Sequence, residues 1–339
     1  MQVLKTSKST SIIAHNNPDP DALASAMGLR FLLQKKGYKK VRIFYDGLIG
    51  RAENQAMIKV LNIPLCRTQN ISNIKNRQFI LVDCQPQSTN VTLPADAFPV
   101  AVIDHHPQKK GISSVPFYDI RPEYGASTTI ISEYFLDDEI SMPQNLSTAL
   151  AYGISSETQL LGREGSPADR KVYKELISDA SFRLLSKIQY PKISKDFVAN
   201  LSKALTRVVF YKNLIGVLLE RLPYPDFVAE LADFLLRVRN MTWSICLGDY
   251  RERIFISVRT SNTETDASRI IKKFIPRKGT AGGHSMIAGA QIDIAGMPPE
   301  EIRASKEAVL LKMLHALDHR NVTELFSLAG DDKISLGEN

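Results

Sequence analysis

Three short apolar runs in the first third of the chain each end at a residue that can bind a metal ion. The runs and the residues that follow them are Ser11–Ala14 with His15, Phe79–Val82 with Asp83, and Val100–Ile103 with Asp104. Segments with helical periodicity alternate with short apolar runs, and this alternation predicts a mostly parallel sheet with right-handed crossovers. Because the carboxyl ends of parallel strands lie at one edge of a sheet, we expect the three residues to converge in space.

The remaining pattern predicts two α/β domains. Further helices are expected at 21–36, 55–61, 128–135, 144–152, 170–185 and 266–274, and further strands at 41–45, 243–247 and 254–258, the last two joined by a turn at 248–251. A chain of 339 residues is too long for one ordinary core. We therefore expect a parallel-sheet domain at 1–190 with helices on both faces, a linker at 191–200 and a smaller α/β domain at 201–339.

Charge and composition restrict the class of protein. The formal net charge is +7 and the isoelectric point about 9.2, and this surplus of Lys and Arg suggests a phosphorylated or polyanionic ligand. The apolar stretches are shorter than the ~18–20 residues that span a bilayer, and the first residues lack the apolar segment of a signal peptide. We therefore expect a cytoplasmic protein with no membrane partner.

The cysteines predict neither a disulfide framework nor a metal ligand. Cys66, Cys84 and Cys246 are widely spaced and odd in number, which argues against a set of disulfides. Cys84 adjoins Asp83, but a thiolate fits poorly among carboxylate ligands. We therefore interpret Cys84 as a small buried residue.

The polar segment after the first apolar run supports a metal centre. In His15-Asn16-Asn17-Pro18-Asp19-Pro20-Asp21, a helix N-cap would explain Asp19 before a proline, but it would explain neither His15 nor Asp21. Together with Asp83 and the triplet at 104–106, these residues predict a dinuclear centre. Carboxylates with two imidazoles favour Mn²⁺, admit Mg²⁺, Fe²⁺ or Co²⁺, and disfavour a structural zinc site. Two such ions ~3.5–4 Å apart activate water for hydrolysis of a phosphoester or phosphoanhydride, with Asp83 as the shared carboxylate.

These motifs resemble the DHH phosphoesterase family, which is named for the triplet seen here as Asp104-His105-His106. The first motif is HNNPDPDA at 15–22, the second is Asp83, and the fourth is GISSET at 153–158. The segment GGHSMIAGA at 282–290 resembles the signature of the associated DHHA1 domain. The resemblance covers nearly the whole chain and implies a DHH domain followed by a DHHA1 domain, with the active site in the cleft between them.

The resemblance also implies roles for single residues of the first domain. The residues implied for one ion are His15, Asp19 and Asp83, and those implied for the other are Asp21, Asp83, His105 and Glu157. His106 would act beside Asp83 in catalysis, as a hydrogen-bond donor to the scissile phosphate or a proton donor to the leaving oxygen. Asp104 would orient a histidine rather than bind metal.

In the second domain the resemblance implies a substrate site. Gly282, Gly283 and His284 would bind the far end of the substrate, and Arg259 would contact phosphate. Taken from the residues alone, the glycines also fit a tight turn with close packing, and Arg259 also fits a solvated basic residue. The family usually has Asp where this chain has Glu157, whose extra methylene can displace or weaken the second ion.

Within the family, the chain length, the lack of transmembrane segments and the glycine-histidine segment at 282–284 favour the compact oligoribonuclease (nanoRNase) and pAp phosphatase group. RecJ-type exonucleases are longer and carry an OB-fold, and membrane-bound cyclic-dinucleotide hydrolases carry transmembrane segments. We expect hydrolysis of short oligoribonucleotides, 3′-phosphoadenosine 5′-phosphate (pAp) or linear dinucleotides, without binding of long duplex nucleic acid, and a homodimer is compatible with the sequence. Two alternatives stay open: a pyrophosphate or polyphosphate phosphohydrolase, and a nucleotide-binding protein that Glu157 has weakened as an enzyme.

Overall fold

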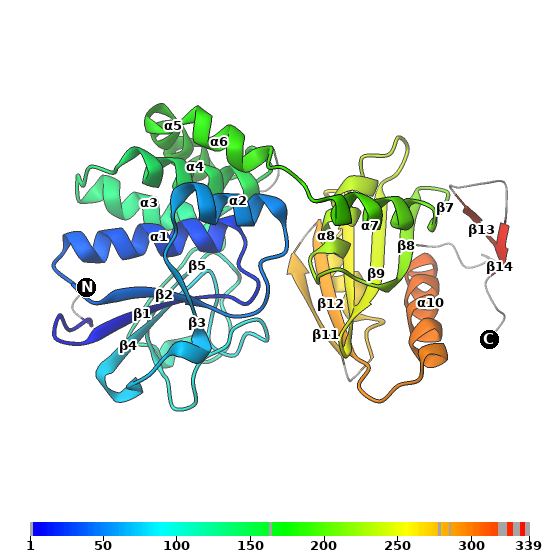
Figure 1. Cartoon of the computed structure of the whole chain (residues 1–339), viewed down its shortest axis with the longest axis horizontal. Coiled ribbons are helices and arrows are strands. Elements are labelled where there is room, and N and C mark those ends of the chain that lie inside the picture. Colours follow the sequence, from blue (N-terminus) through cyan, green and yellow to red (C-terminus); the bar gives the residue numbers. More distant parts are fainter. Residues whose placement is uncertain are drawn as a thin grey trace. The chain divides into compact units, whose positions relative to one another are not determined.

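The chain divides into two compact units, Met1–Lys192 and Ile193–Asn339, each with its own sheet (Figure 1). The computed structural model describes residues 3–162, 165–276, 279–284, 286–317, 324–327 and 333–335. The α/β class, with a parallel sheet in the first unit and a second α/β unit after it, is confirmed.

The first unit is built on a six-stranded parallel sheet. Its strands are β1 (Ser9–Ala14), β2 (Val41–Tyr45), β3 (Leu65–Arg67), β4 (Arg77–Val82), β5 (Pro99–Asp104) and β6 (Phe117–Ile120), in the order β3-β2-β1-β4-β5-β6. The strand order reverses direction between β1 and β4, and such a switch point opens a crevice at the carboxyl edge of the sheet. Ala14 pairs with Val82, and Val82 pairs with Ile103, so the residues that follow these three strands begin side by side.

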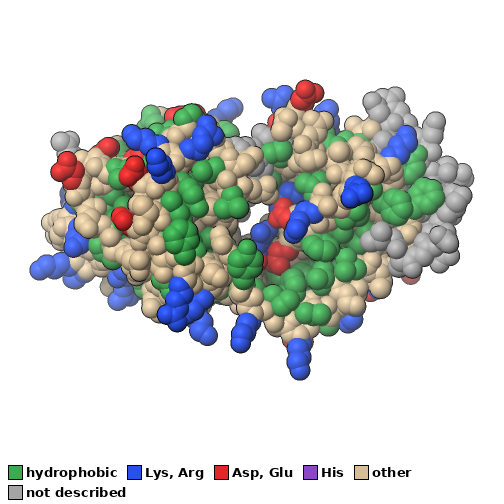
Figure 2. Space-filling view, turned by 90° about the horizontal axis from the view of Figure 1, so that it is seen from above, with side chains coloured by type: hydrophobic (Ala, Val, Ile, Leu, Met, Phe, Trp, Pro, Cys, Tyr) green, Lys and Arg blue, Asp and Glu red, His purple; other side chains and the backbone are tan. Residues whose placement is uncertain are grey.

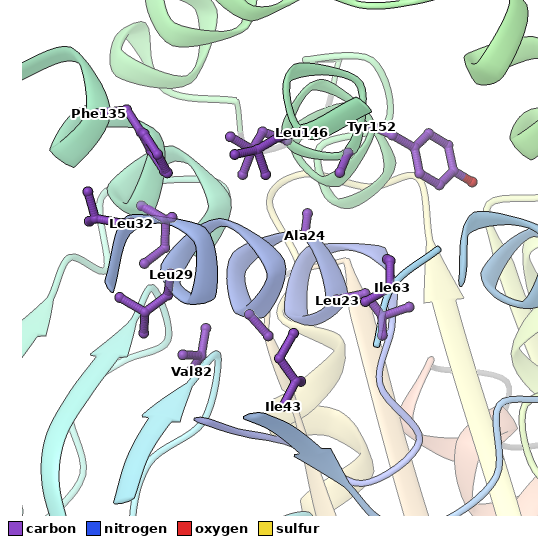
Figure 3. Packing of buried hydrophobic residues seen from close by; sticks show 14 of the residues in the cluster. Leu23, Ala24, Leu29, Leu32, Ile43, Ile63, Val82, Phe135, Leu146 and Tyr152 are labelled. Atoms are coloured by element: carbon purple, nitrogen blue, oxygen red, sulfur yellow. The ribbon is translucent and has the colours of Figure 1, made fainter. Parts of the chain in front are cut away.

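Helices cover one face of this sheet. They are α1 (Pro20–Lys35), α2 (Ala52–Leu61), α3 (Ser127–Asp137), α4 (Gln144–Glu157), α5 (Pro167–Asp179) and α6 (Phe182–Gln189). Figure 3 shows α1 between the sheet, which contributes Ile43 and Val82, and the neighbouring helix α4, which contributes Leu146. Helix α1 is therefore buried on both sides, and its N-terminus is fixed at the carboxyl edge of the sheet.

The opposite face is covered differently from the prediction. Phe44, Phe79, Leu81 and Val102 point to this face and pack against Ile112 from a 3₁₀ turn. The 3₁₀ turns of the unit are η1 (Thr68–Asn70), η2 (Ile74–Asn76) and η3 (Ile112–Ser114). Right-handed crossovers that run in opposite directions from the switch point lie on opposite faces. The β4–β5 and β5–β6 connections contain turns and loops rather than the α-helices that were expected on this face.

The region before the second unit also differs from the prediction in its details. The single helix expected at 170–185 is two helices, because Ser181 is an N-cap whose side chain accepts a hydrogen bond from the Leu184 N–H. The segment predicted as a linker, 191–200, already contains the start of helix α7 (Lys195–Leu205), which is capped by Ser194.

The second unit has an eight-stranded sheet with helices on both faces. Its strands are β7 (Val208–Tyr211), β8 (Leu214–Arg221), β9 (Trp243–Tyr250), β10 (Arg253–Thr260), β11 (Gly279–His284), β12 (Ile287–Asp293), β13 (Glu324–Ser327) and β14 (Lys333–Ser335), in the order β11-β12-β10-β9-β8-β7-β13-β14. Its helices are α7, α8 (Phe227–Leu235), α9 (Ala267–Lys272) and α10 (Pro299–Ala316). Helices α9 and α10 contribute to one core and α8 to the other.

Two expectations in this unit fall at different places in the structure. The turn predicted at 248–251 lies at Arg251 and Glu252, because β9 runs on to Tyr250, which pairs with Arg253. The glycine-rich segment forms the antiparallel hairpin β11–β12, in which β11 is an edge strand.

Two surface properties bear on ligand classes. Among the described residues, none of the helices combines the length and the apolar character needed to cross a bilayer. On the face shown in Figure 2, Lys and Arg side chains are dispersed rather than gathered into one patch. The net charge of +7 therefore does not mark a single basic surface on that face.

Candidate metal centre

The first group of ligands forms where β1 and β4 end. His15 follows β1, Asp83 follows β4, and Asp19 is the N-cap of α1, where its side chain accepts a hydrogen bond from Ala22 N–H at 3.0 Å. The His15 Nε2 atom lies 3.5 Å from Asp19 Oδ2 and 3.5 Å from Asp83 Oδ2. These three residues offer one ligand atom each within the reach of a single metal ion.

A second group shares Asp83 with the first. His105 Nε2 lies 3.6 Å from Asp83 Oδ1 and 3.8 Å from Asp21 Oδ2, and His106 joins His105 and Asp83 in a set of ligand atoms close enough for one ion. The two oxygens of Asp83 thus face different histidines, Oδ2 toward His15 and Oδ1 toward His105. This is the arrangement in which one carboxylate can contact two ions.

The two buried histidines are held in the tautomer that a metal requires. His15 Nδ1 donates to the Asn16 carbonyl at 2.9 Å, and His105 Nδ1 donates to the Tyr124 carbonyl at 3.2 Å. With a proton fixed on Nδ1, the Nε2 atom of each ring faces the carboxylates and is the nitrogen left to bind a metal ion. His105 Nε2 is buried and has no hydrogen-bond partner among the described residues. An orphaned ring nitrogen among carboxylates fits a divalent cation.

Backbone groups of the sheet and of α3 hold the central carboxylates. Asp83 adopts a left-handed conformation with φ 58°, and its N–H donates to the Ile103 carbonyl at 2.9 Å. Ser127 Oγ donates to Asp83 Oδ1 at 2.9 Å, while the N–H groups of Ser127 and Thr128 donate to the two oxygens of Asp21 at 2.8 Å. The N-terminus of α3 therefore stabilises negative charge on Asp21 through its N–H groups and dipole.

Without a cation the cluster is electrostatically crowded. Burial, followed by the charges of Asp83, Glu157 and Asp19, raises the pKa of Asp21 well above its ordinary value. Burial alone would lower the pKa of His15, but its ion pairs with Asp19 and Asp83 raise it well above its ordinary value. Divalent cations would relieve the repulsion between these carboxylates and displace the proton from His15.

Asp104 and His106 form a pair beside the two groups. Asp104 is buried, and its Oδ1 accepts a hydrogen bond from His106 Nδ1 at 2.9 Å. The His106 side chain is 41% exposed, so part of the imidazole faces solvent while Nδ1 is held. Burial would lower the pKa of His106, but the hydrogen bond to Asp104 and the charges of Asp83, Asp104 and Glu157 raise it to about 10 in the metal-free protein. In the metal-free protein these carboxylates therefore favour the protonated form of His106.

Glu157 is the last residue of α4, and its charge acts on two members of the cluster. It contributes to the raised pKa of Asp21 and to that of His106. Its role as a ligand of the second ion stays a prediction.

The comparisons with known proteins agree with this geometry. Residues 9–154 match the N-terminal domain of the DHH family. The matched residues, here called the DHH domain, all lie in the first unit. A manganese-dependent inorganic pyrophosphatase of Methanocaldococcus jannaschii is 25% identical over 132 residues, which cover 39% of this chain and 39% of that protein. A probable manganese-dependent inorganic pyrophosphatase of Enterococcus faecalis is 26% identical over 149 residues, covering 44% and 48%.

Two similarities extend beyond the DHH domain. An uncharacterized protein of Methanocaldococcus jannaschii is 31% identical over 324 residues, which cover 95% of this chain and 65% of that protein. The chain thus spans less than two thirds of the length of these curated relatives. The crystal structure of an exopolyphosphatase-related protein from Bacteroides fragilis has a TM-score of 0.61 at 15% identity, covering 91% of this chain and 94% of that one. At that identity the likeness concerns the fold.

The predicted substrate residues lie in the second unit, at some distance in sequence from the DHH domain. Arg259 is buried near the end of β10, where its Nε donates to Asp233 Oδ1 at 2.6 Å and its Nη1 to Ser257 Oγ at 2.7 Å. Gly283 has φ 131°, and a Cβ there would lie 2.3 Å from the Ile287 carbonyl oxygen. At Gly282 a Cβ would meet no described atom within 4 Å. Packing thus explains Gly283 but not Gly282.

The predicted roles of these second-unit residues stay predictions. His284 is the last residue of β11, and its side chain lies outside the described residues.

Sequence reasoning missed the residues that hold the ligands of the DHH domain. Ser127 and Thr128 lie more than a hundred positions from Asp21, and Tyr124 acts through its carbonyl, which any residue has. Gln85 is different, because it follows Asp83 by two positions and is only 1% exposed. A glutamine two positions after a strand-end ligand was a signal that could have been used.

Proposed function

We propose that this chain is a phosphohydrolase that works with two Mn²⁺ ions bound to the DHH domain. The observation that carries the proposal is the pair of overlapping ligand groups that share Asp83 through its two oxygens. Carboxylate oxygens with imidazole nitrogens suit Mn²⁺, and the names of two pyrophosphatase relatives state manganese dependence. In this proposal His15, Asp19 and Asp83 hold one ion, and Asp21, Asp83, His105 and Glu157 hold the other.

The chemistry follows from what each residue can do. When bound, two such ions supply electrophilic activation of phosphoryl oxygens and a water of lowered pKa. Asp83 holds the two ligand groups in a fixed position relative to each other, because Ser127 and the strand backbone fix its carboxylate. His106 provides a hydrogen bond to the phosphoryl group or a proton to the leaving oxygen, and Asp104 holds its ring by Nδ1.

For the substrate we propose short oligoribonucleotides and small nucleotide phosphates such as pAp and linear dinucleotides. In this proposal, residues that select the substrate lie beyond residue 154, where the family match ends. Gly282 supports a close backbone approach by a ligand, since a side chain at this exposed position would find open space. In this proposal the part of the substrate remote from the scissile bond is bound by Gly282, Gly283, His284 and Arg259. The protein acts in the cytoplasm as a monomer or homodimer. It does not bind long duplex nucleic acid.

A second candidate is hydrolysis of pyrophosphate or polyphosphate. The names of the pyrophosphatase relatives favour it, and the DHH domain could carry it out with the same ligands. It differs from the first proposal because it needs no recognition of a base. A binding protein with a weakened second ion, caused by Glu157, would turn over none of these substrates.

Turnover of a matched substrate panel tests the proposal. The panel contains 5′-labelled RNA from dimer to 24-mer, pAp, a linear dinucleotide, pyrophosphate and polyphosphate, each with Mn²⁺ and with chelator. Asp83→Asn should abolish turnover, and the same change at the exposed Asp137 in α3 should leave it intact.

Each outcome of this panel points to one reading. Preferential Mn²⁺-dependent loss of the shortest RNAs or of pAp supports the nucleotide proposal. Preferential pyrophosphate or polyphosphate turnover replaces it with the second candidate. Absence of all turnover refutes both, and Glu157→Asp then tests whether the second ion limits activity.

A further inference from the structure

Gln85 makes a set of hydrogen bonds beside Asp104, and none of the predicted residue roles accounts for them. Its Nε2 donates to Asp104 Oδ2 at 2.7 Å and lies 3.3 Å and 3.2 Å from the carbonyl oxygens of His106 and Pro107. Its Oε1 accepts a hydrogen bond from the Lys109 N–H at 2.8 Å. The side chain is 1% exposed, so these contacts are made away from solvent.

The chemistry of this position requires an amide. The NH₂ end faces only acceptors, three oxygens that share its two N–H bonds, and the oxygen end faces a donor, which is the polarity of a glutamine amide. A glutamate would place a negative oxygen against the Asp104 carboxylate and two carbonyls. An aliphatic side chain would leave Asp104 Oδ2 without this donor, and a buried acceptor that loses its partner is costly.

Asp104 connects Gln85 to His106. One carboxylate oxygen, Oδ2, is bound by Gln85, and the other, Oδ1, accepts from the ring Nδ1 of His106 at 2.9 Å and from the His106 N–H at 3.2 Å. Donors on both oxygens fix the rotation of the carboxylate plane. The direction of the His106 ring depends on that plane, because its Nδ1 is held by Oδ1.

We propose that Gln85 is a positioning residue that acts through Asp104 to aim the His106 imidazole. This inference rests on the proposed function, in which His106 contacts the phosphoryl or leaving oxygen. Gln85 touches neither substrate nor ion in it. Removal of an outer partner of this kind typically lowers activity about 10–100-fold.

A purely structural role gives a different expectation. The contacts of Gln85 with the carbonyls of His106 and Pro107 and with Lys109 N–H also tie the 105–109 loop to the end of β4. If that tie were its whole contribution, loss of Gln85 would lower stability without acting through Asp104. The two roles are separated by a double-mutant cycle and by a direct signal from the His106 ring.

The variants are Gln85→Leu, Gln85→Glu, Asp104→Asn and Gln85→Leu with Asp104→Asn, all in the full chain. Gln85→Glu keeps the side-chain volume if the leucine variant folds poorly. Gln108→Leu is the matched control, since Gln108 is an exposed glutamine in the same loop. In the metal-free proteins, NMR follows the His106 Nδ1–H proton, assigned with His106→Gln. With Mn²⁺, calorimetry gives ion affinity and steady-state kinetics give kcat and KM on the substrate identified above.

The expected result has three parts. Both Gln85 variants lose the slowly exchanging, hydrogen-bonded Nδ1–H signal that the wild type and Gln108→Leu retain. They lower kcat about 10–100-fold while KM and Mn²⁺ affinity stay within a few-fold. Gln85→Leu adds nothing further to Asp104→Asn.

An unchanged Nδ1–H signal in both Gln85 variants overturns the inference, as do a kcat within two-fold of wild type or losses that multiply with Asp104→Asn. If the wild type turns over no phosphoester, the proposed function fails, and the NMR signal alone decides the role of Gln85.

Discussion

Replacement of Gly153 by alanine should disturb the packing that holds Asp21. Gly153 lies in α4 where that helix meets α1, and a Cβ there would lie 2.6 Å from Thr128 Oγ1 and 2.8 Å from the Ala24 Cβ. Thr128 Oγ1 donates to the Asp21 carbonyl at 3.2 Å and lies 3.1 Å from the Ser25 hydroxyl. A methyl group at 153 would therefore push on the helix turn that carries Asp21.

The magnitude follows from two opposing effects. Non-bonded carbon contacts are most favourable at about 3.5–4.0 Å, so both distances are roughly 1 Å too short. Overpacking of this kind costs about 1–3 kcal/mol, whereas alanine is favoured over glycine within a helix by about 0.8–1.0 kcal/mol. Gly153→Ala should thus destabilise the first unit by about 1 kcal/mol. For a unit of this size, 1 kcal/mol corresponds to a Tm decrease of about 2–4 °C.

Differential scanning calorimetry of the metal-free full chain, together with Mn²⁺ titration, measures both effects. Gly153→Ala should lower the Tm of the first unit and weaken Mn²⁺ binding, whereas Gly282→Ala, with open space around its Cβ, should change neither. Thr128→Ala removes one of the two close atoms. The double variant should therefore lose less stability than the sum of the losses in Gly153→Ala and Thr128→Ala. A Gly153→Ala protein with a Tm and Mn²⁺ affinity at or above those of the wild type would refute the steric reasoning.

Three further outcomes are expected of the metal centre. Mn²⁺ at a hundred times its Kd should raise the free energy of unfolding by about 2.7 kcal/mol for each bound ion, measured by chemical denaturation, and Asp83→Asn should remove this increase. Ser127→Ala should lower the free energy of unfolding of the metal-free protein by about 1.5–3 kcal/mol, because Asp83 loses a hydrogen bond to its charged carboxylate, and a change below 0.5 kcal/mol would contradict this. Folding raises the pKa of His15. The stability that the protonated His15 ring contributes is therefore fully present below the unfolded pKa of about 6.5, and it is lost as pH rises through the folded pKa. The Tm of the metal-free protein should therefore fall from pH 6.5 upward, whereas His15→Gln should reduce this fall and saturating Mn²⁺ should abolish it.

The sequence by itself determined the strands of the first unit and the residues that meet at their ends. The runs at 11–14, 79–82 and 100–103 lie within β1, β4 and β5, because short β-rich apolar runs buried on both faces have few other structures open to them. Their parallel pairing then brings His15, Asp83 and Asp104 to one edge. The ligand types were likewise readable, since metal chemistry restricts which side chains can serve.

Only the tertiary structure decided how these ligands are held. The N–H groups of Ser127 and Thr128 meet Asp21, and Gln85 meets Asp104, through contacts between separate segments of the chain. Backbone donors leave no trace in residue type, and the turns that replace helices on one face of the sheet depend on which crossover runs to which side. The sequence specifies the chemistry of the centre because ligand atoms belong to residue types. Its geometry depends on long-range packing, which no local pattern records.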